Sequence, residues 1–66
     1  MKLMVTNPSY AAKAYLHDCE VTEGVAYYEN DEEAWITGDD EHLLETLMDE
    51  VKEDLDEEDY EDIYLA

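Results

Sequence analysis

The chain has 66 residues, of which 21 are Asp or Glu and three are Lys, with no Arg, so its formal net charge is −18 at pH 7. Such a charge excludes direct binding to DNA, RNA or an anionic membrane, because all three need cations at the interface. Apolar residues still make up 45% of the chain, which is too many for a solvated acidic tail. The composition therefore indicates one folded domain, residues 1–66, whose partner is basic or a metal ion.

The single cysteine, Cys19, cannot form a disulfide within the chain. A domain of this size is only marginally stable by itself, so either a monomer or a homodimer is expected. A lone cysteine is typical of a reducing compartment. No apolar run has the length of a signal peptide or a membrane-spanning helix, so a cytoplasmic location is expected.

The first predicted elements are a short strand and a short helix. Residues 2–5 are expected to form the strand. Pro8 fixes its own φ angle and Ser9 is a good N-cap, and the alanines that follow favour helix, so a short helix is predicted near residues 9–17. The same residues could also form a strand.

A hairpin is predicted next. Residues 21–28 and 35–37 carry β-branched and aromatic side chains on either side of a polar turn, residues 30–33. Gly38 ends the second arm of this hairpin. The two arms would form part of an antiparallel sheet.

Residues 40–55 are predicted to form one long acidic helix. Asp39 or Asp40 would cap its start, and acids in the first turn suit the positive end of the helix dipole. Apolar residues recur at i, i+4, i+7 and i+11, which defines one stripe: Leu44, Met48, Val51 and Leu55. Leu43 and Leu47 widen this stripe, and most of the acids fall elsewhere on the helix.

The tail, residues 56–66, fits two structures. Tyr60, Ile63 and Tyr64 have helical spacing, whereas the alternation of apolar and polar residues there also fits a strand. The apolar stripe slips out of phase after the long helix, so a break is expected at residues 56–58. The predicted fold class is α+β, a small antiparallel sheet with the long helix packed on it.

The acids are unevenly distributed along the chain. Residues 1–17 contain none, residues 18–33 hold seven, and residues 39–62 hold the other fourteen. Successive turns of a helix rise about 5.4 Å, so carboxylates repeated at that pitch can stand in for phosphates along a nucleic-acid strand. Rows of acids from the helix, the hairpin turn and the tail approach the charge density of B-DNA, one charge per about 1.7 Å of axis.

A halophilic or merely solubilising surface is the plain alternative. An ordinary helix surface mixes both signs of charge in stabilising i, i+4 pairs, but here Lys52 is the only lysine in the acidic half. Like charges held close together cost free energy. Their retention favours a use in binding a basic partner.

Other chemistry has weak support. One cysteine and two distant histidines make neither a zinc set nor a catalytic triad, so a buried Cys19 and a surface His17 are expected. A calcium loop would need Gly and Glu where the chain has Asp59 and Leu65, although the alternate spacing is present at Asp54, Asp56, Glu58, Tyr60 and Asp62. No enzyme activity, metal or cofactor is therefore predicted. Six tyrosines and Trp35 exceed the needs of a small core, and Tyr60 and Tyr64 are the preferred interface anchors.

A compact, very acidic chain with few lysines and scattered aromatics resembles phage-encoded DNA mimics. The segment from Leu43-Leu44-Glu45 through Asp59-Tyr60-Glu61-Asp62 carries the likeness, which is one of charge and size over roughly residues 18–66. The group includes anti-restriction proteins, uracil-DNA glycosylase inhibitors and small anti-CRISPR proteins. An anti-CRISPR protein that blocks target-DNA binding is the favoured member, and a glycosylase inhibitor the second.

The resemblance implies that the partner is a basic DNA-binding protein, namely a CRISPR effector subunit. It also implies that the two proteins bind in the cytoplasm of an infected bacterial host. An antitoxin or another acidic sequestering protein is the alternative from a different class. The residues expected to contact the partner come from the hairpin turn, one row of the helix and the tail: Asp31, Glu32, Glu45, Asp49, Glu53, Asp56, Tyr60 and Asp62.

Overall fold

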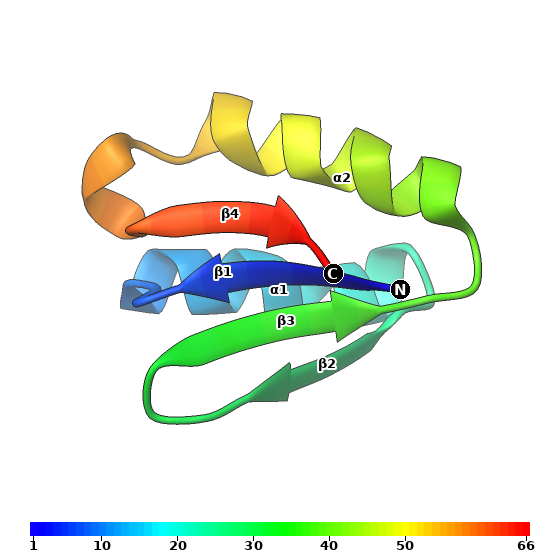
Figure 1. The fold of residues 1–66 in the computed structure, drawn as a ribbon, viewed down its shortest axis with the longest axis horizontal. Coiled ribbons are helices and arrows are strands. Elements are labelled where there is room, and N and C mark those ends of the chain that lie inside the picture. The colour runs from blue at the N-terminus through cyan, green and yellow to red at the C-terminus, as the bar shows by residue number, and fades with distance from the viewer.

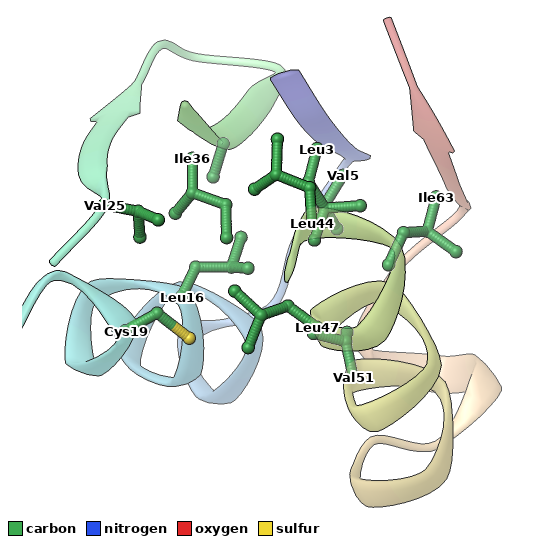
Figure 2. Packing of buried hydrophobic residues seen from close by; sticks show 11 residues of the cluster. Leu3, Val5, Leu16, Cys19, Val25, Ile36, Leu44, Leu47, Val51 and Ile63 are labelled. Atoms are coloured by element: carbon green, nitrogen blue, oxygen red, sulfur yellow. The ribbon is translucent and has the colours of Figure 1, made fainter. Parts of the chain in front are cut away.

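The computed structural model describes residues 1–66 and contains four strands, two α-helices and one 3₁₀ turn. In chain order these are β1 (Lys2–Thr6), α1 (Tyr10–Thr22), β2 (Ala26–Glu29), β3 (Glu33–Thr37), α2 (Glu41–Asp54), η1 (Glu57–Asp59) and β4 (Asp62–Leu65). The strands form one antiparallel sheet, and both helices lie on the same face of it (Figures 1 and 2). The predicted α+β fold is confirmed.

The strand order is β2-β3-β1-β4, so each helix connects strands that are not neighbours. α1 packs on β2 and β3, while α2 packs on β1 and β4. This order of elements is the split β-α-β, or ferredoxin-like, arrangement. Many unrelated functions use this topology, so the function must be argued from the surface residues.

α1 is longer than the sequence predicts. A helix was expected near residues 9–17, and α1 instead continues to Thr22. Ser9 caps it as expected, because its hydroxyl oxygen accepts a hydrogen bond from the Ala12 N–H at 3.1 Å. The extra length follows from an apolar face that does not stop at residue 17: Ala12, Leu16 and Cys19 are all buried.

The extended helix changes the hairpin. The predicted arm over residues 21–28 is wrong in its first half, which ends α1 and passes through Gly24 at φ +72°, a conformation that favours glycine. β2 begins only at Ala26 and pairs with β3, so the hairpin itself is present. The second arm is longer than the predicted residues 35–37, because β3 starts at Glu33.

α2 lies within the predicted residues 40–55, and the carboxylate of Asp40 caps it by accepting the Leu43 N–H at 3.2 Å. The predicted stripe is only half correct. Leu44 and Val51 are buried, but Leu47 is buried in place of Met48, which is half-buried. Leu55 is half-buried as well. Leu47 points toward Leu16 and Cys19 of α1, so the helix is turned toward its neighbour (Figure 2).

The core is a single layer between the sheet and the two helices (Figure 2). No charged or polar residue is buried in it. Eleven residues make up this cluster: Leu3, Val5, Leu16, Cys19, Val25, Ala34, Ile36, Leu44, Leu47, Val51 and Ile63. Neither helix is long and apolar enough to cross a membrane.

The tail forms a strand, and the predicted break lies at η1. β4 pairs with β1, and the backbones of Lys2 and Ala66 exchange two hydrogen bonds of 2.8 Å, so the two chain ends meet. Strand alternation prevails because β1 would otherwise lack a partner on that edge. Ile63 then points into the core, and its neighbours Asp62 and Tyr64 point away from it.

We predict that Leu47→Ala destabilises the fold by about 2–5 kcal/mol, because a buried leucine is lost. A domain of this size has only about 3–10 kcal/mol of stability in total. Met48→Ala should cost less, and Thr46→Ala, on the exposed face, should change the free energy of unfolding by about 0.5 kcal/mol or less. Urea unfolding followed by circular dichroism measures all three. A Leu47→Ala variant that is more stable than Met48→Ala would contradict this orientation of α2.

Candidate functional site

The outer face of α2 carries a row of three exposed carboxylates, Glu45, Asp49 and Glu53, hereafter the helix row. They are four residues apart, so successive carboxylates stand about 6 Å apart along the helix axis. The buried side of the helix, at Leu44, faces the sheet, so the row faces solvent on the opposite side. These three predicted site residues are thus brought together.

The helix row is not neutralised by the rest of the chain. The structure has two close ion pairs, Lys13 with Glu29 at 3.2 Å and His17 with Glu20 at 3.6 Å, and both lie away from α2. Lys52, the lysine of α2, forms no ion pair. The negative potential of the row is therefore available to a partner.

The turn acids lie elsewhere, at one end of the sheet. Asp31 and Glu32 occupy the β2–β3 turn, where the side-chain oxygen of Asn30 accepts the Glu32 N–H at 2.9 Å. The Asn7 N–H donates to the Glu32 carbonyl at 2.6 Å, and the Asn7 side chain donates to the carboxylate of Glu61. Four carboxylates surround a shallow depression here, hereafter the sheet-end cluster: Glu32, Glu33, Glu61 and Asp62.

Asp56 and Tyr60 flank η1. Asp56 is exposed, and its N–H donates to the carboxylate of Asp59 at 3.1 Å. Tyr60 is half-buried and packs against the hydrophobic core, so much of its ring is already covered. Tyr28 and Tyr64, at 52% and 39% exposed, offer more ring surface to a partner.

The eight predicted contact residues therefore divide into three groups, on α2, at the sheet end and beside η1. Asp62 joins Glu32 in the sheet-end cluster because Thr6 of β1 pairs with both Glu33 and Asp62. The helix row lies on the helical side of the two-layer fold. No single patch contains all eight residues.

The residues that have the alternate spacing of a calcium loop do not form one loop in the structure. Asp54 ends α2, Glu58 lies in η1 and Asp62 begins β4, so these residues span three elements rather than one loop. No group of three or more His, Cys, Asp or Glu side chains is placed to hold a metal ion. Cys19 is buried and His17 exposed, as expected, and burial together with nearby carboxylates raises the pKa of the Cys19 thiol.

The sequence analysis missed a surface on the open face of the sheet. One residue from each strand contributes to a continuous cross-strand row, hereafter the aromatic row: Tyr28, Trp35, Met4 and Tyr64. The rings of Tyr28 and Trp35 stack with centroids 6.0 Å apart. The two-residue period of a strand was the signal that could have placed these rings opposite the core, because it puts Trp35 on the other face from Ala34 and Ile36, and Tyr64 on the other face from Ile63.

Comparisons with protein-family models, with curated proteins and with solved structures return no match for this chain. Its function therefore has to be argued from the helix row, the sheet-end cluster and the aromatic row. All three consist of side chains suited to binding cationic groups.

We predict that Tyr15→Phe lowers stability by about 0.5–1.5 kcal/mol, because the Tyr15 hydroxyl donates to the Asp54 carboxylate at 2.7 Å and ties α1 to α2. Burial first, and then Asp54, raises the pKa of Tyr15 above its ordinary value near 10. A raised folded-state pKa contributes stability that is full below pH 10 and is lost as pH rises further.

Urea titrations at pH 8, 10 and 11 measure this dependence. The decline in stability between pH 8 and pH 11 should be shallower for Tyr15→Phe than for the wild type. Tyr10→Phe is the matched control, since the Tyr10 side chain is 88% exposed and forms no side-chain hydrogen bond, so this variant should keep the stability of the wild type. A steeper decline in Tyr15→Phe would contradict the role of this hydrogen bond.

Proposed function

We propose that the protein is a nucleic-acid mimic that binds the basic DNA-binding surface of another protein and excludes DNA from it. The observation that carries this proposal is the helix row, three exposed carboxylates in line with no cation paired to them. Lysine and arginine side chains that hold phosphates can bind carboxylates in the same way, through charge-assisted hydrogen bonds.

The position of the acids supports mimicry of a whole duplex rather than of one phosphate. The molecule measures only 28 × 23 × 21 Å, and carboxylates are present both on α2 and at the sheet end. A cleft that surrounds DNA contacts the bound duplex from more than one side. A body of this size with acids on several sides can fill such a cleft.

A purely solubilising surface explains the helix row less well. Glu45 and Asp49 are neighbours at i, i+4, as are Asp49 and Glu53, and each such pair of like charges destabilises a helix by about 0.2–0.5 kcal/mol. Solubility could be obtained with acids placed farther apart. The arrangement is instead suited to meeting a row of cations.

The proposed target is a CRISPR effector subunit, which follows from the resemblance in size and charge to small anti-CRISPR proteins. Inhibition of uracil-DNA glycosylase has less support, because such inhibitors pair their acids with an apolar pocket. The depressions beside the helix start and at the sheet end have no hydrophobic lining, and the three depressions that do include apolar residues contain none of the helix-row acids. The acidic chemistry is therefore better matched to a phosphate-binding cleft.

We predict that duplex DNA displaces the protein from its target and that the affinity falls steeply between 0.05 and 0.5 M salt, because exposed charge pairs are screened beyond about 10 Å at 0.1 M. Pull-down from a phage-infected bacterial lysate, with and without excess duplex, identifies the target. Titration of the purified pair then measures the salt dependence. Simultaneous binding of DNA and this protein would indicate a sequestering partner such as an antitoxin, not a mimic.

We also predict that the triple variant Glu45→Gln, Asp49→Asn, Glu53→Gln loses inhibition. Breaking one desolvated charge pair in an interface costs about 2–5 kcal/mol, so the single variants should range from mild to severe, and the three together should abolish binding. The matched control is Asp18→Asn, Glu23→Gln, Glu58→Gln, which removes the same charge from exposed sites off the row. An equal loss of inhibition in the two triple variants would show that only net charge matters.

A further inference from the structure

The open face of the sheet has three chemically distinct rows that run across the strands. The middle one is the aromatic row, Tyr28, Trp35, Met4 and Tyr64. On one side of it lie Glu33, Thr6 and Asp62, with a carboxylate on each flank of Thr6. On the other side lie Ala26, Thr37 and Lys2. Both helices cover the opposite face, so these residues lie outside the eleven-residue cluster between the sheet and the helices, and Met4 is the one among them that is buried (Figure 2).

The aromatic row already holds a cation. The Lys2 ammonium lies 5.6 Å from the centroid of the Trp35 ring, within the range of a cation–π interaction. Tyr64 is oriented by its hydroxyl, which donates to the carboxylate of Glu33 at 3.3 Å. Ring faces and carboxylates therefore adjoin one another on this surface.

We propose that the open sheet face binds an arginine-bearing segment of a basic partner protein. A guanidinium is planar and stacks on aromatic rings while its N–H groups bond to carboxylates. Residues two apart on a strand are about 7 Å apart. A guanidinium stacked on Trp35 or Tyr64 is thus within reach of Glu33 or Asp62.

A second copy of the chain is a poorer occupant. Four strands about 4.8 Å apart and five residues long cover roughly 300 Å² in plan, whereas a stable interface buries about 800 Å² per partner. Each copy also carries a net charge of −18, so two copies repel one another. Nucleic acid is disfavoured because its phosphates would approach Glu33 and Asp62.

This inference rests on the proposed function in one respect, that the partner is basic. It is otherwise separate, because the aromatic row and the helix row lie on opposite sides of the two-layer fold. Variants of one surface should leave the other unchanged. The two proposals can therefore fail independently.

The test uses two peptides of equal charge, nona-arginine and nona-lysine, titrated into the full chain at about 0.15 M salt. Trp35, the one tryptophan, reports binding to this face by its fluorescence. Nona-arginine should bind more tightly than nona-lysine. Tyr28→Leu and Tyr64→Leu should each reduce this preference by about two- to five-fold, the value of one exposed cation–π contact.

Two controls accompany the test. Tyr28→Phe and Tyr64→Phe retain the rings and should retain the preference, which separates ring stacking from any loss of fold. The triple variant of the helix row should weaken both peptides alike and leave their ratio unchanged. Circular dichroism establishes that each variant is folded.

Equal affinity for the two peptides, or an arginine preference that survives both leucine variants, would overturn the proposal. Saturable quenching of Trp35 by a single-stranded oligonucleotide would overturn it too, in favour of nucleic acid. If the helix-row variant still inhibits while the arginine preference behaves as described, mimicry through α2 fails and this docking surface stands. If inhibition is lost but the peptides bind equally, the reverse holds.

Discussion

Mutual repulsion among the carboxylates is the constraint on which the rest of this structure depends. A net charge of −18 acts against a core of eleven residues. The fold meets the constraint by separation, because every buried residue is apolar and the carboxylates lie at or near the surface. Some carboxylates also support the backbone, as Asp40 does at the start of α2 and Asp59 does beside η1. The three acids of the helix row make no such contribution.

The same separation produces surfaces of different chemistry on the two sides of the sheet. The helical side presents carboxylates in line and is suited to cations that normally hold phosphates. The open side presents stacked rings beside two carboxylates and is suited to a guanidinium. Under the two proposals both surfaces bind basic groups, and a partner that surrounds a body of 28 × 23 × 21 Å can contact both. The proposed functions therefore rest on the arrangement of charged and aromatic side chains at the surface, because the ferredoxin-like topology is used for many unrelated functions.

The sequence predicted an element correctly where its residues fitted only one secondary-structure pattern. Residues 40–55 combined a cap with a helical period, and α2 lies there. Its rotation was missed because Leu47 and Met48 are both apolar, and only the presence of α1 decides which one is buried. The start of β2 was predicted too early because the β-branched Val21 favours a strand locally. α1 nevertheless continues past residue 17, because the longer helix buries Cys19. The grouping of Asp62 with Glu32 depended on β4 pairing with β1, a contact between distant residues that no local pattern encodes.

The most direct test of the claim that the helix row is held for binding, at a cost to the fold, is the stability of the triple variant Glu45→Gln, Asp49→Asn, Glu53→Gln. Its free energy of unfolding in low salt should exceed that of the wild type by about 0.4–1 kcal/mol, since two like-charge pairs are removed. The difference should shrink in 1 M salt, where the Debye length is about 3 Å. A triple variant that is less stable than the wild type in low salt would show that these carboxylates serve the fold, and would contradict the account.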